Sequence, residues 1–379
     1  MSNCVVRFGG NSLSKLPVIE AFSSLLANTT DDTIVVVSAI PDLVKILEEG
    51  IELLKNGNIS ADSIIDQVDE LVAERLKMFN LIEKNLNVYI EINNLQNLLK
   101  GIEFTGDFSI ALKDQVISYS ERITAGILKL FLDVKCVEVE LVYPEIINLV
   151  VTEEFGNATV LLDGSANLTS SLTNGKFLIP GSYGITKNGK TARLGKYSAD
   201  YSAAAITCIV GANALQLWEI DCEFRTADLS FVTDSQLISR LTYAEASELS
   251  YFSQQSIHPR IVEPLINKHI PIHVYRLLNK SKELTTIINS ESVISPNVVK
   301  SVVHTDEIAI LKLNGPGVGF KPGILAKVTT AFHEAAINIR SVITSQVSIN
   351  IILNNDEIEK ARLICDTLPL SSVNEIVIE

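Results

Sequence analysis

The stretch CVVRFGGNSLSK, from Cys4 to Lys15, decides the fold. It begins as a short apolar run, typical of a buried strand, and stops at Gly9 and Gly10, with one cation, Arg7, just before them. Glycine lets the backbone approach a bound anion closely, and backbone N–H groups ahead of a helix form a concave anion site. The stretch therefore predicts a strand, an anion-binding turn and a helix.

Strand and helix signals alternate beyond this stretch to about residue 275, which indicates an α/β domain with a largely parallel sheet. A mainly helical region from about Ser60 to about Leu132 is too long for one crossover, and we expect a helical subdomain inserted over one end of the sheet. A glycine-rich loop is expected over residues 180–196. The predicted strands are TIVVVSAI, CVEVELV, LVVT, KFLIPG, LQLWEI and IPIHVYRLL.

The last segment has the order strand, helix, strand, strand, helix, strand, which is the ferredoxin-like βαββαβ plan. A polar run with one short strand precedes it. We therefore expect a catalytic α/β domain over residues 1–278, a linker over 279–301 and a small C-terminal domain over 302–379.

Composition narrows the function classes. The 379 residues are 47% apolar and 20% charged with a net charge of -14, so we expect no nucleic-acid partner, since phosphate backbones need clustered Lys and Arg. Apolar runs fall short of the roughly 20 residues that span a bilayer, and no signal peptide is recognised, so we expect a cytoplasmic protein that does not bind membranes. The five cysteines suggest neither a disulfide framework nor a zinc site.

Charged residues beside the glycine turns suggest phosphoryl transfer, which needs alignment and charge neutralisation more than covalent help. Arg7 could neutralise an anion from one turn, and Lys196 and Arg193 from the loop opposite. Glu121 and Asp200 each enter a predicted helix. The alternatives are a snorkelling strand-end cation and simple helix caps. None of the turns is a Walker loop or a G-x-G-x-x-G dinucleotide loop.

Several segments resemble, in order, the motifs of the aspartokinases of the amino acid kinase superfamily. VVRFGGNS is similar to V-x-K-F-G-G-T-S, and SYSERITAGIL to S-x-G-E-R-x-S-A. PGSYGITKNGKTARLGKYSADYSAAAI is similar to G-F-x-G-x-T-x-x-G-x-x-T-T-L-G-R-G-G-S-D-Y-[ST]-A-A, and LTYAEASELSYFSQQSIHP to S-Y-x-E-A-x-E-L-A-x-F-G-A-K-V-L-H-P. The resemblance covers nearly the whole chain.

This resemblance implies a three-layer amino acid kinase fold with a C-terminal ferredoxin-like ACT domain, and transfer of the ATP γ-phosphate to the β-carboxylate of L-aspartate with Mg²⁺. It also implies an amino-acid effector at the ACT domain and a homodimer. No protein-held metal site is expected. The implied site residues are Arg7 and Asp200 for catalysis, Ser38, Glu121 and Lys196 for the substrate, and Gly9, Gly10, Gly181, Gly184, Thr226 and Asp228 for the nucleotide.

The sequence departs from the family pattern at several of these positions. Arg7 stands where the family has its catalytic lysine, and Lys196 where it has a substrate-binding arginine. The other departures are Asn11, Val44, Ala199, Ile220, Cys222, Gln255 and, in the ACT segment, Arg340. Two alternatives to an active aspartokinase follow: a catalytically impaired paralogue acting as a regulatory or assembly partner, and a kinase for a different amino-acid carboxylate.

Overall fold

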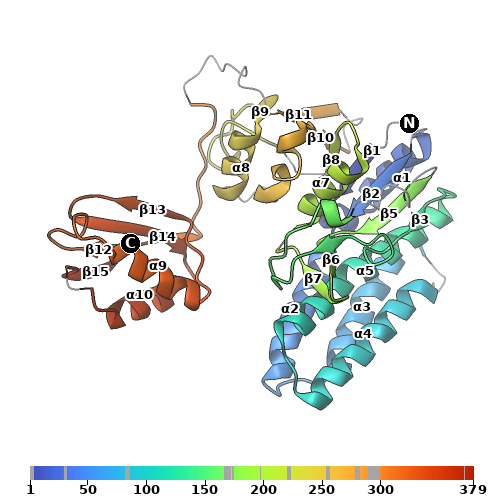
Figure 1. Ribbon diagram of the computed structural model, residues 1–379. Helices are drawn as coiled ribbons and strands as arrows, with labels where there is room; N and C mark the ends of the chain where they lie inside the picture. The colour runs from blue at the N-terminus through green and yellow to red at the C-terminus, as the bar shows by residue number, and fades with distance from the viewer. Residues whose placement is uncertain are drawn as a thin grey trace. The chain divides into compact units, whose positions relative to one another are not determined.

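The computed structural model describes residues 4–29, 32–81, 86–165, 172, 175–196, 198–219, 223–252, 257–277, 282–288, 299–370 and 372–379. They form two compact units, Met1–Val303 and His304–Glu379 (Figure 1). Among the described residues, no helix is both long and apolar enough to cross a membrane.

An eight-stranded sheet in the order β3-β5-β2-β1-β8-β10-β11-β9 organises the first unit. Strand β1 lies near its middle, with Arg7 in register with Val36 on one side and Leu217 on the other. Among the described strands of this sheet, only the β10–β11 pair is antiparallel. The strands are β1 Cys4–Phe8, β2 Thr33–Val37, β3 Glu140–Leu141, β5 Lys176–Pro180, β8 Leu215–Glu219, β9 Arg240–Thr242, β10 Ile272–Arg276 and β11 Lys282–Ile288.

Helices cover both faces of this sheet, because successive side chains of a strand point to opposite sides. Val6 packs into a core with the helices of one face, and Val5 packs into a separate core on the other face. The predicted three-layer fold is confirmed. The first face carries α1 Leu16–Asn28, α2 Pro41–Lys55, α3 Ala61–Met78, α4 Leu86–Thr105 and α5 Ile110–Val134, and the second carries α7 Ala199–Val210 and α8 Tyr243–Phe252.

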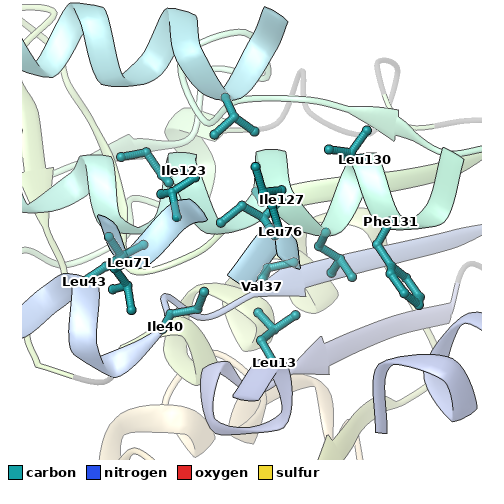
Figure 2. Packing of buried hydrophobic residues seen from close by; sticks show 14 of the residues in the cluster. Leu13, Val37, Ile40, Leu43, Leu71, Leu76, Ile123, Ile127, Leu130 and Phe131 are labelled. Atoms are coloured by element: carbon teal, nitrogen blue, oxygen red, sulfur yellow. The ribbon is translucent and has the colours of Figure 1, made fainter. Parts of the chain in front are cut away.

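Helices α3, α4 and α5 lie in the region expected to form a helical subdomain, and α2, which precedes that region, packs with them side by side (Figure 1). Apolar side chains at helical spacing converge from several of them toward the sheet. Figure 2 shows Leu76 and Ile127 from two of these helices close to Val37 of β2, with Leu43 of α2 beside Leu71 of α3. This shared core fixes α5, which carries two of the acids described below, against the central strands.

The predicted loop over residues 180–196 is wrong in part, because most of it forms a β-hairpin. Strands β6, Tyr183–Thr186, and β7, Thr191–Arg193, pair antiparallel, and β6 pairs in parallel with β4, Val150–Val151. The Asn188-Gly189 dipeptide, with Gly189 at a φ of +76°, is a typical hairpin turn signal. The strand predicted over CVEVELV shrinks to the two residues of β3.

The second unit has the predicted βαββαβ order. Its strands are β12 Ile308–Asn314, β13 Ser341–Thr344, β14 Ser348–Asn354 and β15 Glu375–Ile378, and its helices are α9 Ile324–Glu334 and α10 Ile358–Thr367. The sheet order is β13-β14-β12-β15 with antiparallel pairings throughout. Strand β11 lies inside the segment expected to be a linker, so part of that segment completes the large sheet of the first unit.

Candidate functional site

Two glycine turns and one loop gather at the carboxyl ends of β1, β2 and β5. Gly9 is the N-cap residue of the short 3-10 helix Gly10–Ser14. A Cβ atom on Gly10 would overlap the carbonyl oxygen of Ala39. The N–H of Ser38 donates to the carbonyl oxygen of Phe8 at 3.1 Å. The turn after β1 and the loop after β2 are therefore in direct backbone contact, which only glycine at position 10 allows.

The start of α7 packs against the turn after β5. The N–H of Gly181 donates to the carbonyl oxygen of Val37 at 2.9 Å, and a Cβ on Gly181 would lie 2.8 Å from that of Ala199. The N–H groups at the start of α7 have no partner within the helix and carry its positive partial charge. In open α/β sheets, ligands bind in the crevice at the carboxyl ends of the strands, which is where these elements meet.

Arg7 and Asp200 form a buried ion pair at this point. The Nε atom of Arg7 contacts Oδ1 of Asp200, and Oδ2 of Asp200 accepts a hydrogen bond from the N–H of His258 at 2.7 Å. Burial raises the pKa of Asp200, and the Arg7 charge opposes that rise. The cation predicted to face a phosphate is thus already oriented by a carboxylate in the first turn of α7.

His258 supports Asp200 through its backbone and not through its ring. Its Nδ1 atom accepts a hydrogen bond from the N–H of Arg260 at 3.2 Å, and this is a helix-capping arrangement. Burial and the nearby Arg260 lower the pKa of His258 to about 4, so the ring is neutral at pH 7.

Glu121 is also buried, and it lies in the middle of α5, not at the start of a helix as predicted. It accepts hydrogen bonds from the hydroxyls of Ser120, at 2.9 Å, and Ser182. Burial raises the pKa of Glu121, and the charge of Arg193 opposes the rise. Ser182 has a φ of +64°, a backbone conformation that favours glycine, yet its hydroxyl serves Glu121. Strain of this kind is often found at functional sites.

An open pocket of about 760 Å³ lies between α2, α5 and the hairpin, and Arg193, whose charge acts on Glu121, is part of its wall. Both Lys196, which is exposed, and Arg193, which is buried, line it. Oδ2 of Asp114 accepts hydrogen bonds from the N–H groups of Gly156, at 2.7 Å, and Arg193, at 2.8 Å, which fixes the wall. Its lining residues are Glu48, Glu49, Glu52, Leu53, Ile110, Lys113, Asp114, Ile117, Gly156, Arg193 and Lys196.

The remaining predicted residues occupy different settings. A Cβ on Gly184, inside β6, would overlap Val151, so close packing of β4 and β6 accounts for this glycine. Thr226 exchanges two hydrogen bonds with Gln236, through its N–H and its Oγ1 atom, and closes a loop after β8. The exposed Asp228 caps a turn at Ser230. Gln255, Ile220 and Cys222 lie outside the described residues.

Most residues of the pocket were not predicted, including the acids Glu48 and Asp114. Glu48 and Asp114 carry no local motif, because one is an ordinary acid on an amphipathic helix and the other lies two turns before Glu121 on α5. In the described part of the chain, no group of three or more His, Cys, Asp or Glu residues could hold a metal ion by itself. The described site thus supplies carboxylates and cations in pairs, such as Arg7 with Asp200 and Arg193 with Glu48.

Comparison with known proteins places these features in a family. The amino acid kinase family model matches residues 3–276. The chain is 28% identical to a bifunctional aspartokinase/homoserine dehydrogenase of Buchnera aphidicola, over 88% of this chain and 42% of that protein. It is 25% identical to the chloroplastic aspartokinase 1 of Arabidopsis thaliana, over 95% of this chain and 65% of that protein. The chain therefore spans less than two thirds of the length of both.

Solved structures agree on the fold. The structure of Escherichia coli aspartokinase III in complex with aspartate and ADP matches with a TM-score of 0.80 and 19% identity, over all of this chain and 85% of that one. The complex of the same enzyme with lysine and aspartate matches with a TM-score of 0.79 and 20% identity, over 99% and 84%. These matches confirm the predicted amino acid kinase fold, and the curated relatives confirm the resemblance to aspartokinases.

Proposed function

Since this chain belongs to the amino acid kinase family, we propose that it transfers the γ-phosphate of ATP to the β-carboxylate of L-aspartate. The observation that carries the proposal is the buried Arg7–Asp200 pair where the glycine turns and the start of α7 meet. A fixed cation beside backbone N–H groups at a helix N-terminus is suited to a transferring phosphoryl group. The names of the relatives support the choice of acceptor.

In this proposal, the N–H groups of Gly9, Gly10 and Gly181 receive the phosphates, and Arg7 neutralises charge on the transferring group. A carboxylate acceptor is ionised at neutral pH, so it attacks phosphorus without a general base. Asp200 holds the Arg7 guanidinium in one orientation, which lowers the reorganisation needed in the transition state. We assign Gly184, Thr226 and Asp228 to the nucleotide side on the resemblance alone.

Mg²⁺ fits this donor set as a partner of the nucleotide. The ion usually keeps several waters and is bound by one or two carboxylates plus substrate phosphates, so a protein cage of three acids is not required. Asp200 would be the carboxylate that holds it, since it lies in the first turn of α7, where the phosphates are proposed to bind. When bound, Mg²⁺ would neutralise phosphate charge.

The acceptor amino acid is assigned to the open pocket and the adjoining acid on α5. Glu121 is a buried carboxylate that could receive the substrate ammonium, and Ser38 lies at the end of β2 beside the glycine turn. Lys196 stands exposed at the pocket wall, where its ammonium could attract a carboxylate.

Trapping of the acyl phosphate with hydroxylamine tests the proposal. With ATP, Mg²⁺ and L-aspartate, the chain should form aspartyl hydroxamate, and Asp200→Asn should lower the rate by about 100-fold or more, the effect of removing one key charge from a transition state. Arg7→Met should be equally impaired and Arg7→Lys should retain activity. Asp133→Asn, at an exposed position on α5, is the matched control. Absence of hydroxamate with L-aspartate would reject the proposal and favour the impaired paralogue.

We further propose that residues 302–379 form an ACT-type regulatory domain joined by the 279–301 segment to a catalytic domain over 1–278, that it binds an amino-acid effector, and that it pairs two copies of the chain. The βαββαβ order supports this, and strand β13 forms one edge of its sheet. Light scattering should give twice the 41.4 kDa monomer mass. Ile343→Asp, at a 56% exposed position on β13, should shift the mass toward the monomer.

A further inference from the structure

Arg193 is a buried cation in the wall of the pocket. Its side chain is 9% exposed, and its guanidinium carries five N–H donors, of which the structure describes one side-chain hydrogen bond, from Nη1 to Oε1 of Glu48 at 3.2 Å. The Nε atom is buried without a hydrogen-bond partner among the described residues. A guanidinium remains charged when buried, so unused donors facing a pocket favour a bidentate anionic ligand.

The acids around Arg193 differ in how firmly they are held. Asp114 is occupied, because its Oδ2 atom accepts the backbone N–H groups of Arg193 and Gly156. Glu121 is held by Ser120 and Ser182. Glu48, by contrast, has a side chain that is 31% exposed and its described hydrogen bond is to Arg193 alone. Glu48 is therefore the acid that can leave the guanidinium for solvent at the lowest cost.

We propose that Arg193 binds the α-carboxylate of the amino-acid substrate. In the free protein Glu48 forms an ion pair with the Arg193 guanidinium, and the substrate carboxylate displaces Glu48 when it binds. This inference rests on the proposed function, which it deepens by naming the carboxylate-binding residue. Lys196, which is exposed, then contributes long-range attraction at the pocket wall. Burial makes Arg193 the stronger of the two ligands, since its charge is less screened by water.

The pocket's charge also predicts which anions it accepts. Glu48, Glu49 and Glu52 from α2 face it together with Asp114, whereas its cations are Lys113, Arg193 and Lys196. Lys113 is already paired with Glu52 at 2.6 Å. A dicarboxylate without an ammonium group would meet these acids without the positive charge that an α-amino acid brings. The pocket should therefore bind an α-amino acid, with its ammonium toward Glu121, more tightly than the corresponding dicarboxylic acid.

Calorimetric titration of the full chain with L-aspartate and with succinate tests this without requiring phosphoryl transfer. L-Aspartate should bind at least tenfold more tightly than succinate. Arg193→Gln should weaken L-aspartate binding by about 10- to 100-fold, the effect of losing a charged hydrogen bond, and Arg193→Lys should recover part of the loss. Glu48→Gln should strengthen binding by about threefold to tenfold, since the competing anion is gone.

Asp133→Asn is the matched control, because it neutralises an acid on α5 that is paired with Lys129 and does not line the pocket. It should leave the affinity within about twofold. Unchanged or weaker binding by Glu48→Gln would overturn the inference, as would wild-type affinity in a folded Arg193→Gln variant, or no binding of L-aspartate to the wild-type chain. If binding follows the expected order while no hydroxamate forms, the proposed function fails and the carboxylate site stands.

Discussion

Removal of the Arg7 charge should destabilise the first unit in a pH-dependent way. Arg7→Met keeps much of the stem volume and removes the cation that contacts Asp200. Both side chains are buried, and breaking one half of a buried ion pair leaves an uncompensated charge at a cost of about 3 to 5 kcal/mol. We expect the free energy of unfolding at pH 8 to fall by that amount.

Lowering the pH should restore part of the free energy of unfolding that Arg7→Met loses. Burial raises the pKa of Asp200 above its ordinary 3.8 even with Arg7 present, and without Arg7 the pKa should rise further. A carboxyl group whose pKa is raised by folding stabilises the folded state below its unfolded pKa, and this contribution is lost as pH rises through the folded pKa. The deficit of Arg7→Met should therefore be smaller at pH 5 than at pH 8, by about 1.4 kcal/mol for each additional pKa unit.

Urea titrations followed by Trp218 fluorescence measure this directly, because the single tryptophan lies in β8 next to β1. Asp200→Asn in the Arg7→Met background should restore part of the stability, giving a coupling energy of about 2 kcal/mol or more. Lys129→Met, which breaks the more exposed pair with Asp133, should cost less than about 1 kcal/mol. A deficit below about 1 kcal/mol at pH 8, or one that does not shrink at pH 5, would refute the reasoning.

Two further predictions concern the support of the site. Burial and Arg260 lower the pKa of His258 from an ordinary 6.5 to about 4, so its contribution to stability, up to about 3 kcal/mol, is present above pH 6.5 and lost as pH falls toward 4. His258→Gln should flatten the pH dependence of the unfolding free energy over this window, and an unchanged slope would contradict the assignment. Gly10→Ala should lower the free energy of unfolding by more than about 2 kcal/mol, because its Cβ would overlap the Ala39 carbonyl. In the same urea titration, Gly101→Ala, at an exposed position of α4 with open space around it, should raise the free energy of unfolding by about 0.5 to 1 kcal/mol.

Local patterns were enough to predict most of the elements. The run ending at Gly9-Gly10 became β1 and a turn, and the β-branched run from Thr33 became β2, because a fully buried parallel strand needs apolar residues on both faces. The helical region over Ser60 to Leu132 likewise followed from apolar spacing. The hairpin at residues 183–193 was not predicted, because the four glycines of residues 180–196 resembled a phosphate loop, although Asn188-Gly189 signalled the turn.

The sequence by itself determined the family, the two-faced sheet, the βαββαβ module and which charged residues stand beside glycine turns, because these depend on residues close together in the chain. Only the tertiary structure decided which of those charges meet. Arg7 contacts Asp200 across 193 positions, and Arg193 contacts Glu48 across 145. Such pairings depend on how β1 packs beside α7 and how the hairpin lies against α2, and no local pattern specifies them. The opening stretch predicted a cation at an anion site, and the fold supplied its carboxylate partner.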